Sequence, residues 1–373
     1  MPEAPIDAVD AGGDDDDADR KVVEHERAKL RKFITGLSPD DIKGGVWFTK
    51  LVAQALSSYT DKVTWQYFQE RFEGLPADGI VDQRIKMAAR YAALEGGLSG
   101  SAYAATIAAT IGSLGGASPF TVPAAIATVM VDVAFVTQLQ LRLAYDVAFL
   151  YRVPLDLSEP DDLWKLIQVA FTIKSGELTR EGVVKVVPPL MRQVVKKYFS
   201  GPVLVAAKGL PYVGKLLLQR NVIKIAIPLV GIPLAVLLNR YTTLLAGRHA
   251  QAVFRNEARV IELAEGLSKR SQHPQLMLWV AWLVMADHKI ADDEALLIRH
   301  LVRLVRDQHQ VVDEQLAHLV DVDPAEVWRL LDAERGDLSD ILDVANRVAT
   351  VDGAVNARER AIISELQDRC GRV

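Results

Sequence analysis

The sequence predicts an all-α protein, in which an apolar helical-hairpin domain is followed by a smaller helical bundle. Apolar residues recur every three to four positions through most of the charged stretches, which is the spacing of an amphipathic helix. Few stretches alternate strictly between apolar and polar residues, the pattern of a half-buried strand. Half of the 373 residues are hydrophobic, so the chain is long and apolar enough for two cores.

The net charge and the cysteine content limit which cellular compartment and which kinds of partner we expect. The net charge is −5, without the basic excess that nucleic-acid binding needs, so we expect no nucleic-acid partner. Cys370 is the single cysteine, so no disulfide can form within the chain, as is usual in a reducing compartment. The first residues are acidic and lack the apolar core of a secretory signal. These features predict a protein on the cytoplasmic side.

The elements are expected in the following order. Residues 1–19 form a disordered acidic tail, because Asp14 to Asp17 repel one another and nothing apolar offsets the ordering entropy. Helical spacing starts near Arg20. Ser38 and Pro39 then have the pattern of an N-cap followed by proline at the first helical position. Two more amphipathic helices are expected near 61–73 and 79–96.

An apolar block at 97–141 comes next, and its only charged residue is Asp132. The run from Gly115 to Pro119 interrupts the block, which predicts a hairpin with arms at about 98–114 and 120–141. Each arm is close to the lower length limit for a membrane span, since a span needs about 20 apolar residues. The many glycines and alanines would let the two arms pack closely, either in lipid or in a protein core.

A second apolar block, 202–239, has a different character. Cations lie in or beside it, and two prolines would break or kink a helix there. Those cations could reach anionic headgroups at a membrane surface, so the block suits a surface-lying or shallow element. The residues concerned are Lys208, Lys215, Arg220, Lys224, Pro228 and Pro233. Three interpretations of the apolar blocks stay open: a soluble helical core, a peripheral or hairpin-inserted membrane element, and a full span.

Asp132 is the most informative residue of the first block. A carboxylate in a protein core must be hydrogen-bonded or ion-paired, and we expect a backbone amide or a basic side chain from the 208–224 region as its partner. The alternative is a polar site inside an otherwise apolar cavity. Arg142 and Asp146 lie four residues apart on one helical face, which favours a local ion pair.

The run from Gly112 to Leu157 resembles the signature of the EcsC family. The matching residues are Gly112, Gly115, Gly116, Pro123, Asp132, Leu141, Arg142, Tyr151 and Asp156. The later run Ile227–Ala250 resembles that family's C-terminal segment through Pro228, Gly231, Asn239 and Ala250. Arg152 and the pair Ile232-Pro233 depart from the pattern. Coverage is roughly residues 40 to 252, within an expected domain at 20–254.

That resemblance implies a bacterial protein associated with membranes, because the founding member is encoded beside the subunits of an ABC exporter. The family has no settled biochemical activity, so the resemblance implies a location more than a mechanism. Asp132, Arg142 and Asn239 are the candidate ligand-binding or buried polar residues of this domain.

The C-terminal part, residues 255–373, repeats itself: 285–301 aligns with 350–366 at an offset of 65. Each copy is predicted to be a helix, an acidic turn and a second helix. The turns are similar to those of TerB-like domains of the tellurite-resistance type, and this resemblance implies a metal-binding role.

The oxygen-rich turns offer hard ligands suited to calcium or magnesium. The candidate metal ligands are Asp287, Asp292, Glu294, Asp352, Asn356 and Glu359. Asn356 and Glu359 also have the spacing of a capping box, and carboxylates in a first helical turn are favoured by the helix dipole. Either a divalent cation or helix capping therefore explains the pattern.

No nucleophile elbow, phosphate-binding loop or dinucleotide fingerprint is present. The sequence therefore predicts a non-enzymatic accessory or scaffold protein at the cytoplasmic face of a bacterial membrane, with the lipid surface and a membrane transport complex as its partners. Two alternatives stay open. One is a soluble helical protein that binds a lipid or another apolar ligand in its core, and the other is a divalent-metal-dependent enzyme or sensor that uses the acidic turns.

Overall fold

A computed structural model shows that the described part of the chain is helical, without a strand, as the sequence predicts. The structure describes residues 16–57, 59–113, 118–172, 231–285, 292–309, 323–334, 336–353 and 355–370. The chain divides into two compact units, Met1–Phe254 and Arg255–Val373. The division falls inside one continuous helix, α11 (Gly231–Arg270).

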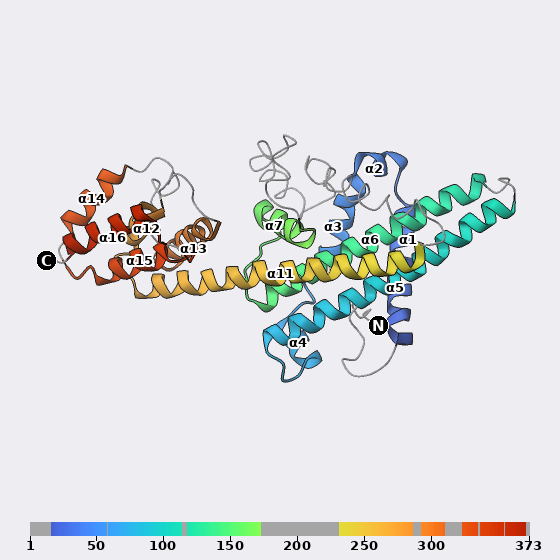
Figure 1. Cartoon of the computed structure of the whole chain (residues 1–373), viewed down its shortest axis with the longest axis horizontal. Coiled ribbons are helices and arrows are strands. Elements are labelled where there is room, and N and C mark those ends of the chain that lie inside the picture. Colours follow the sequence, from blue (N-terminus) through green and yellow to red (C-terminus); the bar gives the residue numbers. More distant parts are fainter. Residues whose placement is uncertain are drawn as a thin grey trace. The chain divides into compact units, whose positions relative to one another are not determined.

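Unit 1 is built on an antiparallel hairpin of two long helices, α5 (Ala77–Gly112) and α6 (Ser118–Leu150) (Figure 1). The expected break between the arms is confirmed, since α5 ends at Gly112 and α6 begins at Ser118. The helices α1, α3 and α7 pack against α6. The remaining bounds are α1 (Asp16–Thr35), α2 (Pro39–Gly44), α3 (Val46–Ser57), α4 (Trp65–Arg71) and α7 (Pro160–Ala170).

The first part of α11 lies along the hairpin and approaches it closely at two glycines. A Cβ atom on Gly96 would lie 2.6 Å from the backbone oxygen of Ala235. A Cβ atom on Gly247 would lie 2.9 Å from the side chain of Ile85 of α5 and 3.0 Å from that of Leu143 of α6. Real Cβ atoms do not come that near, so the missing side chains are what allow α11 to touch both arms of the hairpin.

The N-terminal helix begins earlier than the expected tail boundary. α1 starts at Asp16, and Asp19 is fully buried beside Arg90, with which it forms an ion pair. This charge partner offsets the repulsion that predicted disorder up to residue 19. Residues 1–15 lie outside the described part of the chain. The predicted cap at Ser38 is confirmed: its side chain accepts from the backbone N–H of Asp41, in a complete capping box.

Most of the second apolar block, residues 202–230, lies outside the described part. Its last residues belong to α11, where Pro233 stands in the first turn and therefore removes no hydrogen bond from the helix interior. The expected partner of Asp132 in the 208–224 region likewise falls outside the described residues.

Unit 2 has the predicted pairs of helices. In the first copy of the repeat, α12 (Pro274–Met285) precedes α13 (Asp292–His309), and the turn between them, 286–291, lies outside the described residues. In the second copy, α15 (Ser339–Ala349) precedes α16 (Ala357–Cys370). α12 and α15 pack against each other around a core that includes Trp279. The helix α14 (Pro324–Ala333) packs on α12.

Candidate functional site

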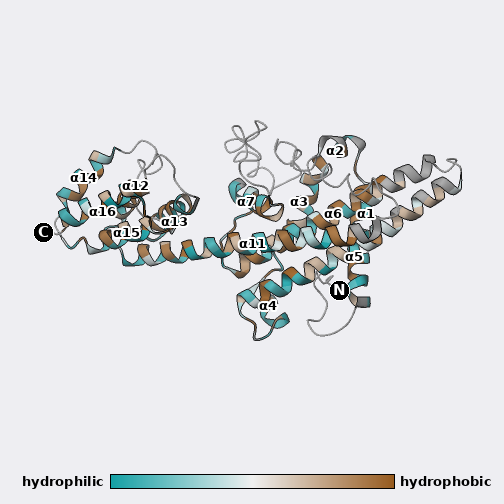
Figure 2. Ribbon diagram, viewed as in Figure 1, coloured by the Kyte–Doolittle hydropathy of each residue, from teal (hydrophilic) through white to brown (hydrophobic). Residues whose placement is uncertain are grey.

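The outer part of the hairpin is exposed and carries no charge. We call residues 101–113 and 118–128 the tip. No Asp, Glu, Lys or Arg occurs in this stretch, and its described residues are white to brown in the hydropathy view (Figure 2). Several of its described side chains are exposed, among them Ala108, Ala109 and Ala124, and Ile126 is 55% exposed. An uncharged helix pair with open apolar side chains is a surface that favours an apolar partner.

The inner part of the hairpin has the opposite character. We call Ala77–Gly100 of α5 and Met130–Leu150 of α6 the base. Its buried side chains include several polar and charged groups, which are Arg84, Glu95, Ser99, Asp132, Thr137, Gln138, Gln140 and Asp146. The base is therefore a protein core with internal polar contacts, which are expensive to leave unpaired.

Asp132 and Asn239 meet in this core. The side-chain nitrogen of Asn239 donates to Asp132 Oδ1 over 2.7 Å, and the hydroxyl of Ser99 lies 3.3 Å from the same oxygen. Asp132 is 7% exposed and Asn239 is fully buried. The expected burial of Asp132 is confirmed. This contact joins α6 to α11 beside the close approach at Gly96.

A second buried carboxyl group, Glu95, lies near Asp132. Its Oε2 is 2.9 Å from Nε of Arg27 on α1, although the contact lacks hydrogen-bond geometry. Burial raises the pKa of Glu95 to about 9, and the nearby Asp132 adds to the rise while Arg27 opposes it. Glu95 is therefore protonated at neutral pH, so it supplies no negative charge to neutralise Arg27.

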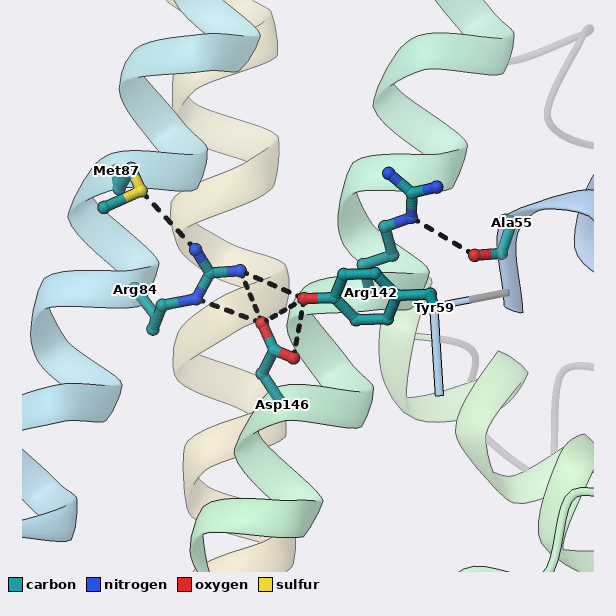
Figure 3. A network of polar contacts seen from close by, with 6 residues as sticks. All are labelled: Ala55, Tyr59, Arg84, Met87, Arg142 and Asp146. Carbon is teal, nitrogen blue, oxygen red and sulfur yellow. Dashed lines mark hydrogen bonds and ion pairs between the residues drawn. The ribbon is translucent and has the colours of Figure 1, made fainter. Parts of the chain in front are cut away.

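The strongest contact of the base is a charged pair that the sequence analysis did not identify. Arg84 donates to Asp146 through Nε over 3.0 Å and through a terminal nitrogen, and the hydroxyl of Tyr59 donates to Asp146 Oδ1 over 2.8 Å (Figure 3). All three residues are less than 5% exposed. The cluster ties α5, α6 and the segment after α3 together.

Arg142 does not form the expected ion pair with Asp146. Its Nε donates to the carbonyl oxygen of Ala55 over 3.2 Å, and its guanidinium carbon lies 4.9 Å from the ring centre of Tyr59 (Figure 3). The reason is that Arg84 and Tyr59 occupy the carboxylate of Asp146. Arg142 also lies away from the contact between Asp132 and Asn239, so the structure joins two of the three candidate residues of this domain.

One described helical segment, Ile126–Leu150, is long and apolar enough to cross a membrane. However, 67% of its apolar window is buried inside the structure, and that segment contains Asp132 and Asp146. A buried segment with charged contacts to neighbouring helices has the character of a core helix. Among the described residues of the hairpin, an uncharged surface without buried side chains occurs at the tip.

A groove of about 420 Å³ lies where the tip meets the base. One wall is a face of α1 with Glu24, Arg27, Ala28 and Arg31, and the other is formed by small side chains of the hairpin, such as Ala102 and Thr128. The α1 residues recur at spacings of three and four, so they share one helical face.

The acidic turns of unit 2 do not assemble a metal site in the described part of the chain, where no group of three His, Cys, Asp or Glu side chains could hold an ion. Asn356 Oδ1 accepts from the backbone N–H of Glu359, and Glu359 Oε2 accepts from the backbone N–H of Asn356. These two residues thus form the capping box that was the alternative to metal binding. Asp352 is exposed, and Asp287 lies outside the described residues.

The first copy of the repeat has a glutamate in the equivalent place. Glu294 is the third residue of α13, as Glu359 is of α16, and both are buried. Asp292, the first residue of α13, begins that helix. Its neighbour Asp293 pairs with Arg259 of α11 over 3.2 Å, and the same guanidinium donates to the carbonyl oxygen of Val351. The guanidinium group of Arg259 therefore links α13 to the turn after α15.

Comparisons of the chain with protein-family models, with curated proteins and with solved structures find no match. The resemblances to the EcsC and TerB-like families stay predictions. The function is therefore argued from the geometry of the hairpin.

Proposed function

We propose that this chain is a non-enzymatic accessory or scaffold protein at the cytoplasmic face of a membrane, which it contacts by inserting the tip of the hairpin into one leaflet. The observation that carries the proposal is the contrast within one pair of helices. The base is closed by buried polar contacts, whereas the tip is uncharged and none of its described side chains is buried.

The length of the tip fits one leaflet. At about 1.5 Å of rise per residue, the stretch of α5 from Ala102 to Gly112 is about 15 Å long. Half of a hydrocarbon core of about 30 Å is also about 15 Å. Within the helical arms the backbone hydrogen bonds are satisfied inside each helix, which lipid requires. The proposed insertion therefore needs no unfolding of the arms.

A transport or stress-response complex of the membrane is the partner that this proposal assigns to the protein. Unit 2 would then serve as a soluble interaction module. The capped turns and the linkage through Arg259 favour a structural role for the acidic residues of unit 2.

Vesicle binding by the full chain tests the insertion of the tip. Ala109 of α5 is exposed, and Ala109→Asp would place a charge in hydrocarbon. Because a charge at the bilayer centre costs about 2.5–3.5 kcal/mol and 1.4 kcal/mol is tenfold, we expect binding to weaken by at least about tenfold in a flotation assay.

The matched control is Ala252→Asp, the same change at an exposed helical alanine of α11, beyond the contact of Gly247 with Ile85. We expect this variant to bind vesicles as the unchanged chain does. Failure of the unchanged chain to bind any vesicle, or equal binding by the Ala109→Asp variant, would overturn the proposed insertion.

A further inference from the structure

The groove between α1 and the hairpin has the chemistry of an anion site. Arg27 and Arg31 both line it, and Arg31 is exposed, with no ion pair to any described residue. Arg27 approaches Glu95 most closely through Nε, at 2.9 Å, and its terminal nitrogens make no hydrogen bond to a described residue. Two guanidinium groups on one helical face present the fork of donors that suits phosphate.

The acidic residues near these arginines do not cancel their charge. Glu24 lines the groove, but its Oε1 is paired with Nε of Arg20 over 3.0 Å. Glu95 lies behind Arg27 and is protonated at neutral pH, because burial raises its pKa to about 9. The groove is therefore positive at neutral pH.

The position of the groove on the hairpin identifies the occupant. Ala102 and Thr128 line its inner wall at the level where the tip begins, and Thr106 and Ala124 line it about one turn further along the tip. When the tip fills one leaflet, this level lies about 15 Å from the apex, at the edge of the hydrocarbon core. Phosphate groups of lipids lie at that depth. The volume of about 420 Å³ is within the range of small-ligand sites, about 300–1,000 Å³.

We infer that this groove binds the phosphate group of an anionic phospholipid, with Arg31 and the terminal nitrogens of Arg27 as the donors. The inference rests on the proposed insertion of the tip, which brings the groove to the headgroups. It adds a lipid class and a second, electrostatic contribution to binding. The apolar tip accounts for insertion into the leaflet, and the groove accounts for the preference for anionic lipids.

Vesicles of phosphatidylcholine, with and without phosphatidylglycerol, test the inference on the full chain. We expect tighter binding when phosphatidylglycerol is present. Arg31→Gln should weaken that binding by about tenfold or more, because a charge-assisted hydrogen bond is lost together with the charge. Binding to phosphatidylcholine alone should stay unchanged.

Two further variants distinguish specific binding of the phosphate in the groove from nonspecific attraction between a cation and an anionic membrane. Lys32→Gln removes the same charge from the next residue of α1, which is exposed and does not line the groove. We expect a loss of at most about fivefold, since one cation near an anionic surface contributes about 1 kcal/mol. Ala28→Leu narrows the groove without changing charge, and Ala28 is exposed, so the larger side chain disturbs no core. It should weaken binding as Arg31→Gln does.

The outcomes separate this inference from the proposed function. Equal losses in the Arg31→Gln and Lys32→Gln variants would overturn the groove as the site. Equal binding to both kinds of vesicle would overturn it as well, while a loss in the Ala109→Asp variant would still support insertion. Release of the protein from vesicles by millimolar glycerol 3-phosphate would overturn the lipid as the source of the phosphate, and we expect no release.

Discussion

The two halves of the α5 and α6 hairpin have similar secondary structure and opposite surroundings. In the base, charged groups are buried and each has a partner from another helix, as Asp132 has Asn239. In the tip no charge occurs, and none of the described alanines is buried. The contrast shows that an apolar helix does not by itself indicate a membrane contact. What distinguishes the halves is whether protein covers the apolar surface.

The largest effect is expected where the base buries its charged pair. Asp146→Ala would leave the guanidinium of Arg84 buried without its counter-ion, and Arg84 is 4% exposed. Breaking a buried ion pair in this way costs about 3–5 kcal/mol. Urea denaturation, followed by circular dichroism, measures the loss in free energy of unfolding. Tyr59→Phe removes the hydroxyl that donates to Asp146 and accepts from Arg84, but it keeps the ion pair. It should therefore cost less, about 1.5–3 kcal/mol, which is typical of hydrogen bonds to charged groups. Equal losses would contradict this account of the base.

The next effect concerns Glu95 and pH. Its pKa in the folded protein is about 9, against an ordinary value of 4.5. Between these values the folded state holds the proton and the unfolded state does not, so stability falls as pH rises. The slope from this residue is at most about 1.4 kcal/mol per pH unit.

Glu95→Gln mimics the protonated side chain and should remove that slope. We expect the variant to gain stability relative to the unchanged chain as pH rises from 6 to 8, measured by urea denaturation at each pH. Parallel pH profiles for the two chains would show that Glu95 is ionised in the folded state.

The hairpin break, the cap at Ser38 and the burial of Asp132 could be predicted from the sequence because each depends on nearby residues. Glycine and proline end helices locally, serine caps the helix that follows it, and a single carboxylate in an apolar run must find a partner. The start of α1 was missed because Asp19 is stabilised by Arg90, far along the chain.

The partners across helices could not be predicted in the same way. Arg84 lies in an amphipathic stretch where an arginine is usually a surface residue, and nothing near it indicates Asp146. The pairing of Arg142 with Asp146 was predicted from their spacing of four residues alone. In the structure Arg84 binds Asp146 instead, and Arg142 donates to the carbonyl oxygen of Ala55. The groove also depends on where α1 packs. Arg31 lines a groove because α1 lies beside Thr128 of the hairpin, and the sequence does not show that contact. Asn239 was identified as a candidate through the resemblance to the EcsC family, but its contact with Asp132 was not predicted.

A smaller effect is expected at the close contact between α5 and α11. Gly96→Ala would place a Cβ atom against the backbone of Ala235, so the helices must separate, at a cost of about 1–3 kcal/mol. The adjacent Gly97 is the control, since its Cβ atom would lie 3.5 Å from Val236, an ordinary contact. Gly97→Ala should therefore be neutral or stabilise the helix by up to about 1 kcal/mol. Thermal unfolding of both variants measures the difference, and a loss shared by both would contradict the close approach.

The smallest effect on stability is expected in the tip. Ala109 is exposed, so Ala109→Asp removes no packed contact. Its cost comes from helix propensity and from a negative charge near the C-terminal end of α5, together about 1 kcal/mol or less. The same variant is expected to lose most of its vesicle binding. Stability that hardly changes, measured by urea denaturation beside a binding loss of tenfold or more, would separate the two halves of the hairpin by function. A stability loss as large as that of Asp146→Ala would instead mean that protein covers the tip.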